Sequence, residues 1–191
     1  MEPMIPPLYA GQLIRLTGID LEKDPETEAR WMRDPAYLRS FGEDVAFPKS
    51  AWQVKKQYEA LEKDADEHAT MFHFQLRPLD DERLLGFARV CWISWPNASG
   101  FVQLAIGDPA DRRKGLGADA LGVLLRYAFD ELNLHRLSAR VPEYSLPAQR
   151  LFGKFGFQVE VRARRMLERD DRRWDQLEYG LLRSEWAIRA A

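Results

Sequence analysis

The segment Gly107-Asp108-Pro109-Ala110-Asp111-Arg112-Arg113-Lys114-Gly115-Leu116-Gly117-Ala118 places three consecutive basic residues and two glycines directly before a helical pattern. That pattern is a set of apolar residues at intervals of three and four, which predicts an amphipathic helix over residues 115–132: Leu121, Leu124, Leu125, Ala128 and Leu132. A helix start leaves backbone N–H groups unpaired and carries partial positive charge, and glycine lets an anion approach the backbone closely. The segment therefore predicts an anion site, for which a diphosphate is the natural ligand.

Two other interpretations of this segment compete with the anion site. One is a solvated turn in which the basic residues face water and the glycines only redirect the chain. The other is a dinucleotide site, since residues 115–120 fit the pattern G-x-G-x-x-G/A. That pattern requires its first glycine directly after a strand of a βαβ unit, whereas about eight residues separate the preceding strand from Gly115. A phosphate loop of the form G-x-x-x-x-G-K-[ST] does not occur.

The composition is that of a globular protein. Of the 191 residues, 46% are hydrophobic and 30% charged, and the net charge of −2 gives no overall attraction to nucleic acid or to an anionic membrane. Cys91 is the only cysteine, which excludes an intrachain disulfide. No signal-peptide pattern or long apolar run is present. We therefore expect a single cytoplasmic domain over residues 1–191, with residues 1–9 as an extended lead-in.

The hydrophobic periodicity predicts an α/β protein with a largely antiparallel sheet. Strands are expected over residues 12–16, 71–77, 84–95, 101–106, 137–141, 157–166 and 174–182. Helices are expected as two short segments within 21–41, interrupted at Pro25 and Pro35, and over 50–65, 115–132 and 148–155. Ser50 is the expected cap of the third helix, with Trp52, Tyr58 and Leu61 buried, and Gly156 the expected cap at the end of the last.

The residues Arg112-Arg113-Lys114-Gly115-Leu116-Gly117 match [RQ]-x-x-G-x-[GA], the signature of the GCN5-related N-acetyltransferases (GNAT), and the chain resembles this family. Residues 106–109, 127–136, 156–157 and 181–186 resemble the branch that contains the ribosomal-protein alanine and spermidine N-acetyltransferases. The resemblance covers residues 13–186 in element order and residues 104–157 at motif level. It implies an α/β (α+β mixed) fold: a mostly antiparallel sheet of six to seven strands with about four helices.

The family resemblance also implies a donor site for acetyl-CoA. In this family the fourth and fifth strands splay apart, and pantetheine lies between them. The implied contacts are the backbone of residues 104–106, the N–H groups of residues 113–118 for the pyrophosphate, and the last helix at the thiol end. The residues so assigned are Leu104, Ala105, Ile106, Arg112, Arg113, Lys114, Gly115, Leu116, Gly117, Ala118, Ser145, Ala148, Leu151, Phe152 and Lys154.

The catalytic groups are less clear, because two positions depart from the family. Ser145 stands where an asparagine is common, and Phe152 where a tyrosine often protonates the leaving thiolate. A thiol pKa of about 8.5 lets the thiolate leave near neutral pH without an acid. Ser145, Tyr144 or a water are the candidate acids, and Ser145 is also the expected N-cap of the helix that continues through Pro147.

No general base is assigned from the sequence. Gln103 occupies the strand position from which family members commonly use a carboxylate, and it cannot accept a proton. The candidates are Glu143 and Asp175, together with Glu43 and Asp44, which are also assigned to the acceptor substrate; each of the four is equally an ordinary solvated carboxylate.

The residues and the resemblance together predict acetyl, or another short acyl, transfer from acetyl-CoA to a primary amine within a ternary complex. A protein N-terminus, a polyamine or another small amine such as an aminoglycoside is a compatible acceptor. Three histidines and one cysteine show no metal-ligand spacing, so no metal is expected. The tryptophans are expected mostly in the core, and a homodimer is compatible with the family. The alternatives are a non-catalytic coenzyme A sensor and a nicotinamide dinucleotide-binding domain.

Overall fold

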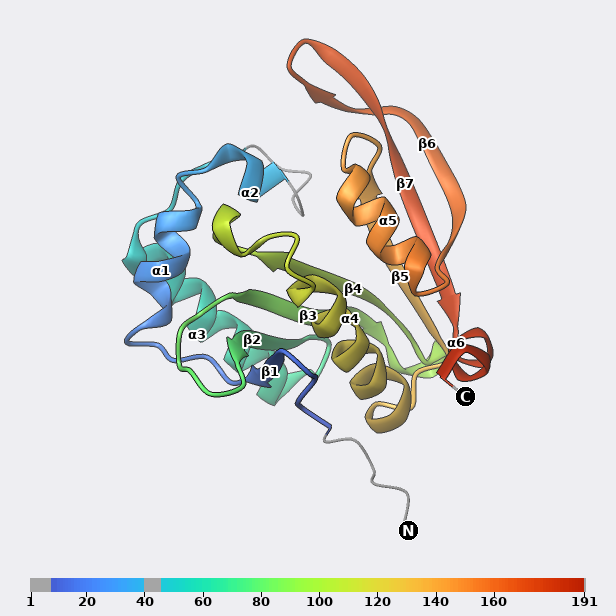
Figure 1. The fold of residues 1–191 in the computed structure, drawn as a ribbon, viewed down its shortest axis with the longest axis horizontal. Helices are drawn as coiled ribbons and strands as arrows, with labels where there is room; N and C mark the ends of the chain where they lie inside the picture. The colour runs from blue at the N-terminus through green and yellow to red at the C-terminus, as the bar shows by residue number, and fades with distance from the viewer. Residues whose placement is uncertain (1–7, 40–45, 191) are drawn as a thin grey trace.

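The computed structural model describes residues 8–39 and 46–190, and its centre is a seven-stranded sheet in the order β1-β2-β3-β4-β5-β7-β6. The strands are β1 (Ile14–Thr17), β2 (Phe72–Pro78), β3 (Gly86–Ser94), β4 (Ser99–Ile106), β5 (Arg136–Pro142), β6 (Gln158–Arg169) and β7 (Arg172–Leu182). Every neighbouring pair is antiparallel except β4 and β5. All seven predicted strands are confirmed, and the parallel pair lies at the centre of the sheet (Figure 1).

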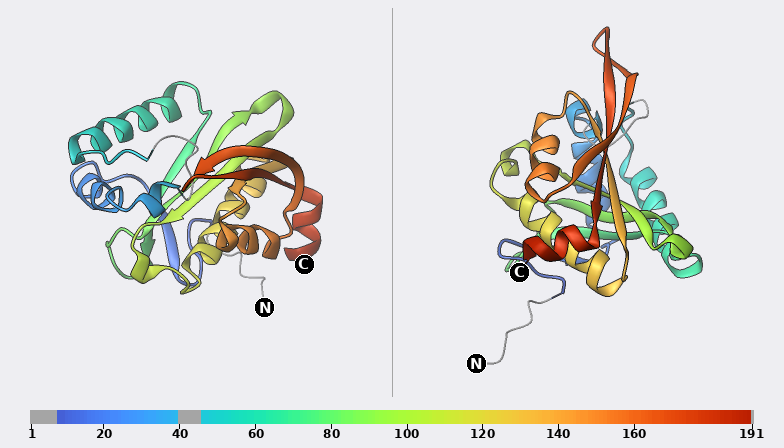
Figure 2. Two further views of the ribbon diagram at one scale, coloured as in Figure 1. Left: turned by 90° about the horizontal axis from the view of Figure 1, so that it is seen from above. Right: turned by 90° about the vertical axis from the view of Figure 1, so that its right-hand side faces the viewer.

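Six α-helices cover the two faces of this sheet. They are α1 (Asp24–Trp31), α2 (Pro35–Arg39), α3 (Ala51–Glu67), α4 (Leu116–Arg126), α5 (Leu146–Lys154) and α6 (Arg183–Ala190). One hydrophobic cluster joins the sheet to α4 and α5, and a second joins it to α1 and α3. Figure 2 shows the two groups of helices on opposite sides of the strands. We call the α4–α5 side the donor side and the α1–α3 side the acceptor side.

β4 and β5 separate soon after they pair. The parallel register runs only through Ser99↔Arg136, Gly100↔Leu137 and Phe101↔Ser138. Beyond Phe101, β4 continues to Ile106 and β5 to Pro142. The predicted splay between the fourth and fifth strands is therefore confirmed, and it leaves one edge of β4 facing a gap.

The helix that follows β4 agrees with the sequence pattern. α4 buries Leu121, Leu124 and Leu125 completely. It continues through a π-helical turn, Tyr127–Glu131, so that the predicted helix over residues 115–132 is confirmed. Gly156, with φ of 91°, ends α5 as predicted, and the N–H of Phe157 bonds to the carbonyl of Phe152.

The acceptor-side helices confirm some predictions and correct one. The Ser50 hydroxyl accepts the N–H of Gln53, and the Gln53 side chain accepts the N–H of Ser50, which forms a capping box. Tyr58 is buried as expected, but Trp52 is 67% exposed, so its expected burial was wrong. Pro25 and Pro35 lie at the starts of α1 and α2, where proline is tolerated because the first helical N–H groups need no partner.

The C-terminal part of the sheet extends beyond the rest of the molecule. β6 and β7 form a long hairpin that projects past α5 (Figure 1), and Asp170 and Asp171 turn it with φ of 53° and 55°. α6 was not predicted, and Trp186 on it stacks near Phe129 at 6.3 Å between ring centroids. The expected burial of most tryptophans was wrong, since none of the six is fully buried: Trp52, Trp92 and Trp95 are largely exposed, and Trp31, Trp174 and Trp186 are partly exposed.

Candidate active site

The loop before α4 has the shape of an anion site. Arg113 and Gly115 adopt left-handed conformations, with φ of 63° and 86°, and Gly115 is the N-cap of α4 without a side-chain capping bond. The loop therefore turns sharply and leaves the first N–H groups of the helix without a side-chain acceptor. Arg113, Lys114 and Gly115 are exposed.

Arg112 differs from the mobile cation expected at this position. Its Nε donates to the carbonyl of Ile106 at 3.2 Å, and its Nη2 donates to the carbonyl of Gly107 at 2.8 Å. The same Nη2 lies 3.6 Å from the Asp34 carboxylate. Arg112 therefore fastens the loop to the end of β4, and only Arg113 and Lys114 remain as exposed cations of the segment.

The space over Gly117 tests whether the loop fits a diphosphate. A Cβ placed at Gly117 would meet only Leu151 Cδ2 of α5, at 3.9 Å. This position at the start of α4 is thus open on the protein side, which suits close approach of an anion to the helical N–H groups. The same contact brings α4 and α5 together, as the predicted donor site requires.

The edge of β4 supplies free backbone groups in the gap. The N–H of Gly107 donates to the carbonyl of Leu85, the residue before β3, and the carbonyl of Ala105 also points toward β3, because it lies 2.0 Å from where a Gly86 Cβ would be. Successive residues of a strand direct their N–H and C=O groups to opposite neighbours. Leu104 and Ile106 therefore face the gap, and the expected backbone contact of Ala105 is corrected to a pairing with β3.

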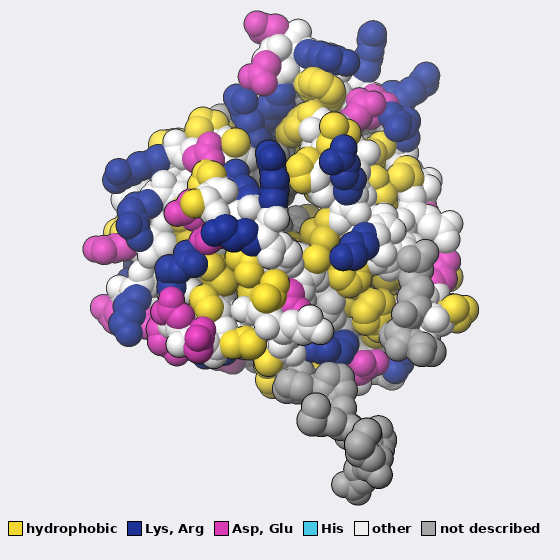
Figure 3. Space-filling model, viewed as in Figure 1, with side chains coloured by type: hydrophobic (Ala, Val, Ile, Leu, Met, Phe, Trp, Pro, Cys, Tyr) yellow, Lys and Arg dark blue, Asp and Glu magenta, His cyan; other side chains and the backbone are white. Residues whose placement is uncertain are grey.

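A long groove continues from the loop along α4. It has a volume of about 960 Å³ and is lined by Gly115, Ala118, Gly122, Lys154 and Phe155, among others. Figure 3 shows Lys and Arg side chains bordering the hollow at the centre of this face. The donor side therefore offers a loop with unpaired helical N–H groups, a groove beside α4 that begins at Gly115, and the separate open edge of β4.

The remaining donor assignments fall on α5. Ala148 and Leu151 are partly buried against the donor-side core, and Phe152 is 5% exposed. The Phe152 ring packs edge-on against Phe157 at 5.1 Å and lies 6.2 Å from Tyr179. Phe152 is thus part of the core, and it has no proton to give.

Ser145 and Tyr144 line a pocket of about 340 Å³ between α2, α5 and the hairpin. Ser145 is the N-cap residue of α5, but its hydroxyl makes no capping bond, so the expected side-chain cap was wrong. The Tyr144 hydroxyl donates to the carbonyl of Arg39 at 3.1 Å, and its ring packs edge-on against Trp174 at 5.6 Å. The two predicted acids therefore lie side by side, and both stay predictions.

Glu143 is engaged by neighbouring groups. Its carboxylate accepts from Arg162 Nη1 at 3.1 Å and from the N–H of Asp175 at 3.1 Å. Asp175 accepts the N–H of Arg165 and the guanidinium of Arg162, which lower the pKa of Asp175. Donors therefore occupy both carboxylates, and the lowered pKa of Asp175 makes that group a poor proton acceptor.

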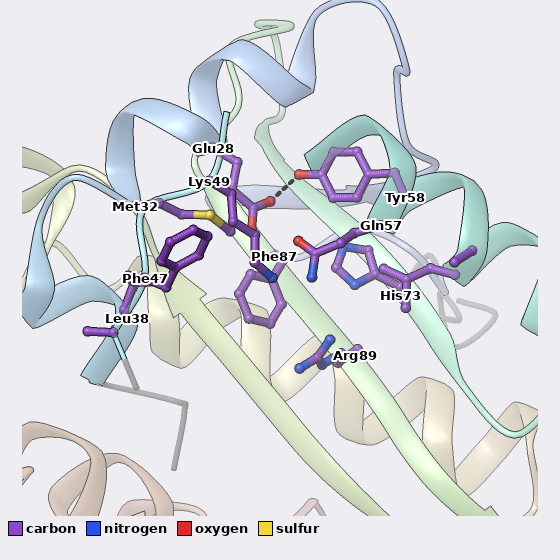
Figure 4. Close-up of a pocket in the computed structure, with 13 residues that line it drawn as sticks. Glu28, Met32, Leu38, Phe47, Lys49, Gln57, Tyr58, His73, Phe87 and Arg89 are labelled. Atoms are coloured by element: carbon purple, nitrogen blue, oxygen red, sulfur yellow. Dashed lines mark hydrogen bonds between the residues drawn. The ribbon is translucent and has the colours of Figure 1, made fainter. Parts of the chain in front are cut away.

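A second pocket lies on the acceptor side and was not predicted. It has a volume of about 380 Å³, and its polar lining includes Glu28, Lys49, Tyr58, His73 and Arg89. Figure 4 shows the Tyr58 hydroxyl directed at the Glu28 carboxylate, to which it donates a hydrogen bond. Met32, Leu38, Phe47, Leu61 and Phe87 provide the apolar lining.

Burial shifts the titration of this pocket's polar groups. Desolvation raises the pKa of Glu28, against the opposing effects of the Tyr58 hydrogen bond and the Arg89 and Lys49 charges. Burial, with the charge of Arg89, lowers the pKa of His73 to about 3, so the imidazole is neutral at physiological pH. Among the carboxyl groups named so far, Glu28 is the one whose pKa moves toward neutrality, as a proton acceptor requires.

The floor of this pocket leads toward the splay. Arg89 of β3 pairs in register with Gln103 of β4, and Arg89 Nε donates to Gln103 Oε1 at 2.8 Å. Phe87 pairs with Ala105 in the same way. Neighbouring strands are about 4.8 Å apart, so the β3 residues that line the pocket lie one strand away from the β4 edge.

A signal for Glu28 was present in the sequence. Asp24, Glu28 and Met32 follow one another at intervals of four, which places them on one helical face. The face is buried, because Asp24 pairs with Arg77 and Glu28 with Tyr58. Polar residues in a helical stripe are usually assigned to solvent, which is why this one was overlooked. The predicted substrate residues Glu43 and Asp44 lie outside the described residues.

Other chemistry finds no support in the described part of the chain. Across residues 8–39 and 46–190, no group of three His, Cys, Asp or Glu side chains could hold a metal ion. None of the helices in these ranges is both long and apolar enough to cross a bilayer. The sheet is mostly antiparallel, so Gly115 does not belong to the doubly wound unit that a dinucleotide site requires.

A parallel strand pair that splays beside an uncapped helix start defines the class of acyltransferases that bind an extended, anionic donor across a sheet. The chain belongs to the GNAT family: the family model described as "Acetyltransferase (GNAT) domain" matches residues 14–158. The resemblance stated from the sequence is confirmed.

Curated relatives agree with this membership. The probable N-acetyltransferase YjcK of Bacillus subtilis is 34% identical over 117 residues, which are 59% of this chain and 60% of that protein. The uncharacterized N-acetyltransferase YnaD of the same organism is 30% identical over 79 residues, 41% of this chain and 46% of the relative. The chain thus spans less than two thirds of either relative.

Solved structures share the fold. The spermidine N-acetyltransferase from Vibrio cholerae, in complex with CoA and spermine, has a TM-score of 0.79 at 18% identity and covers 91% of this chain and 98% of that one. The Mycobacterium smegmatis RimJ in complex with CoA-disulfide has a TM-score of 0.77 at 18% identity, with 93% and 88% covered. At such identities the likeness concerns the fold.

Proposed function

We propose that this protein transfers an acetyl group from acetyl-CoA to a primary amine by direct attack within a ternary complex. The observation that carries the proposal is the β4 edge, open beyond Phe101 and contiguous with the uncapped start of α4. In such an arrangement, the backbone of Leu104 and the N–H of Ile106 offer hydrogen bonds to the amide groups of pantetheine, while the Ile106 carbonyl is bonded to Arg112. The N–H groups of residues 113–118 then hold the pyrophosphate.

The acceptor must lose a proton before its nitrogen attacks the thioester carbon. The C–N bond forms and the C–S bond breaks, and the proton released by the amine ends on the sulfur of the leaving thiolate. Glu28 is the proposed proton acceptor, directly or through a water, because burial raises its pKa and its pocket is lined by β3, the neighbour of β4. Its Tyr58 partner keeps the carboxylate oriented.

The groups on the other side of the splay are proposed to serve the leaving thiolate. Phe152 makes this end of the site apolar and gives no proton. The Tyr144 hydroxyl and the Ser145 hydroxyl, both in the pocket beside α5, are the remaining donors. Homodimer formation and the organisation of residues 1–191 as one domain stay predictions.

Two measurements test the proposal. Acetyl-CoA at a hundredfold excess over its Kd stabilises a binding protein by about 2.7 kcal/mol through mass action, and this appears as a higher Tm. Thiol release from acetyl-CoA, followed against a panel of peptides, polyamines and small amines, measures transfer. Absence of any thermal shift contradicts the donor site, and a shift without amine-dependent thiol release contradicts catalysis.

One alternative, a coenzyme A sensor without transferase activity, has a specific observation in its favour. Phe152 and Gln103 occupy positions where catalytic groups are expected, and the Gln103 amide oxygen is taken by Arg89. The two functions separate in the second measurement: a sensor binds acetyl-CoA and releases no thiol with any amine of the panel. The Glu28 pocket favours the transferase, because donor binding alone does not require it.

A further inference from the structure

The Gln103 side chain of β4 is held in one orientation. Its Oε1 accepts from Arg89 Nε at 2.8 Å and also from Arg89 Nη2. A guanidinium has donors and no acceptor, so the amide can turn only its oxygen toward Arg89, and its NH2 group points away from β3. No described residue accepts a hydrogen bond from this NH2 group. The β4 position that cannot accept a proton thus presents a fixed N–H donor.

Arg89 is itself held by a stacking contact. The carbon of its guanidinium lies 5.2 Å from the centre of the Phe87 ring, and Phe87 is only 2% exposed. Phe87 and Arg89 both line the acceptor pocket from β3 (Figure 4). A guanidinium that bonds through two nitrogens and stacks on a buried ring has little freedom to rotate. Arg89 therefore keeps the Gln103 amide aligned.

Gln103 lies where the two central strands separate. The last parallel pair is Phe101↔Ser138, and Gln103 is two residues further along β4, or about 7 Å at 3.3 Å per residue. Side chains two apart share one face of a strand, so Gln103 is on the same face as Ala105, which packs in the acceptor-side cluster. Gln103 is thus the first acceptor-face side chain of β4 beyond the last pair.

The donor molecule extends toward this point in the proposed complex. Its pyrophosphate is held at the start of α4, which follows the far end of β4 at Ile106. Pantetheine runs from there along the β4 edge, so the thioester comes to the narrow end of the gap, beside Gln103. An amine that enters from the acceptor side meets the thioester carbon at the same place. The fixed NH2 group therefore lies next to the reacting atoms.

An N–H donor beside a thioester has one useful partner. The attacking nitrogen needs its lone pair for the carbonyl carbon, so a hydrogen bond to that nitrogen would oppose the reaction. The carbonyl oxygen gains an electron pair as the C–N bond forms, and it returns this pair to the carbon as the C–S bond breaks. A donor that is already oriented stabilises the transient negative charge without reorganising. A carboxylate at the same position would repel it.

We infer that the Gln103 NH2 group donates a hydrogen bond to the thioester carbonyl oxygen as it becomes an oxyanion, and that Arg89 is the positioning residue that directs it. The inference rests on the proposed acetyl transfer. It gives this position of β4 a role other than proton transfer and leaves that transfer to Glu28.

Two substitutions of similar size test the donor. Gln103→Glu keeps an oxygen for Arg89 and loses the N–H groups, whereas Gln103→Met loses them without adding a charge. Each is expected to lower the rate of thiol release at saturating acetyl-CoA about a hundredfold, as removal of one oxyanion donor does, and to leave the acetyl-CoA Kd within about twofold. Gln158→Glu, the same change at an exposed residue at the start of β6, is the control with an unchanged rate.

The rate is measured with hydroxylamine and with the most active amine of the panel. Hydroxylamine is small and largely unprotonated at neutral pH, so its attack depends neither on a fitted acceptor nor on Glu28. A loss of rate with both nucleophiles therefore reports on the thioester and not on acceptor binding. A loss with Gln103→Glu but not with Gln103→Met would show repulsion by the new charge and overturns the inference.

Substitutions of Arg89 test its positioning role. Arg89→Met is expected to lower the same rate about tenfold, because the released amide adopts other rotamers. Arg89→Lys can still donate to Gln103 Oε1 and is expected to recover part of this loss. Arg89→Met combined with Gln103→Met should be no slower than Gln103→Met alone, since Arg89 acts through the amide. Additive losses would show that Arg89 acts separately and overturn its positioning role.

A spectrum without turnover separates this inference from the proposed function. The infrared carbonyl band of acetyl-CoA, isotope-labelled at that carbon, is expected to move to lower frequency on binding and to lose part of this shift in both Gln103 variants. An unchanged band with an unchanged rate overturns the inference, as does a faster Gln103→Glu, because the position then takes a base. Acetyl-CoA binding without thiol release to any nucleophile contradicts the proposed function, and the catalytic role of Gln103 falls with it.

Discussion

The donor and acceptor sides of this protein use the same sheet in different ways. The donor side presents backbone: the open edge of β4, the uncapped start of α4 and a loop turned by Arg113 and Gly115. The acceptor side presents side chains, with Glu28 and Arg89 in a pocket bounded by helices and strands distant in sequence. A backbone site is encoded within one short segment, whereas a side-chain site depends on how remote elements pack.

The largest expected effect concerns what holds the acceptor side together. Arg77 Nη2 lies 2.8 Å from both oxygens of Asp24, and the two side chains are 6% and 1% exposed. Asp24→Ala leaves the buried guanidinium with only the exposed Glu82 carboxylate, 3.8 Å from its Nε, among the described residues. It is expected to lower the free energy of unfolding by about 3–5 kcal/mol, measured by urea denaturation.

A double variant gives the matching control. Asp24→Leu with Arg77→Met removes both charges and is expected to recover most of this loss, since apolar residues often replace a buried ion pair without cost. Equal instability of the single and double variants would show that packing, and not the unpaired charge, causes the loss.

The next effect breaks the donor side alone. Gly117→Val places methyl groups where the loop is open to an anion, and it is expected to weaken acetyl-CoA binding at least about a hundredfold, or 2.7 kcal/mol, by calorimetric titration. Its Tm should stay close to that of the unmodified protein, because the nearest protein atom is 3.9 Å from the new Cβ. Gly18→Val, at a glycine with no atom within 4 Å of its Cβ position, is the control with unchanged affinity.

A smaller effect addresses the acceptor side without touching donor binding. Glu28→Gln is expected to lower kcat/KM about 10- to 100-fold, at or below the lower end for a general base because water can replace it in part. In the unmodified protein, kcat/KM should rise with pH around the pKa of Glu28, which lies above the ordinary glutamate value of 4.5. This rise should disappear in the variant. Unchanged acetyl-CoA affinity separates this role from a general loss of structure.

Glu28 also has a signature in stability. Its folded pKa is raised, so the folded state binds more protons than the unfolded state at pH values above 4.5. Its contribution to stability is therefore full below pH 4.5 and is lost as the pH rises through the folded pKa. We therefore expect the unfolding free energy of the unmodified protein, relative to that of Glu28→Gln, to fall as the pH rises from 4.5 through the folded pKa. A difference that does not depend on pH contradicts the raised pKa.

The smallest effect lies in the donor loop. Arg83 and Lys114 flank the Asp111 carboxylate and lower its pKa, with Arg83 as the main cause. This contribution is present above pH 3.8 and is lost as the pH falls through the lower folded pKa. Because Arg83 is half exposed, Asp111→Asn is expected to cost only about 0.5–1 kcal/mol at pH 7, and nothing by pH 2. A larger loss at pH 2 than at pH 7 would contradict this sign.

The difference between the two sides also decides what the sequence could predict. The strands, the helix over residues 115–132 and the anion loop follow from periodicity and from local backbone chemistry, and the structure has all three. The splay and the donor assignments came from the family resemblance. The resemblance did not predict which residues of β4 face the gap. Only the observed pairing with β3 shows that the backbone groups of Ala105 point away from it.

The acceptor pocket could not be predicted, because no single segment contains it. Glu28, Tyr58 and Arg89 come from α1, α3 and β3, and their contacts depend on tertiary packing. Trp52 was wrongly expected to be buried for the same reason. Helical spacing predicts which residues share a face of the helix, but not whether another element packs against that face. Ser145 is at the N-cap position of α5, but its hydroxyl forms no capping hydrogen bond. The sequence predicts the position and not whether the bond forms.

The Asp119 carboxylate of α4 joins two segments that the ribosome makes at different times. It accepts the N–H groups of Gln12, Leu13 and Ile14 at 3.0, 2.7 and 3.0 Å, so the donor helix holds the segment that leads into β1. These partners are more than 100 residues apart in the chain. Translation proceeds at about 5–20 residues per second, so residues 12–14 wait roughly 5–20 seconds for Asp119 to be made. The segment before β1 is thus without this anchor during that interval.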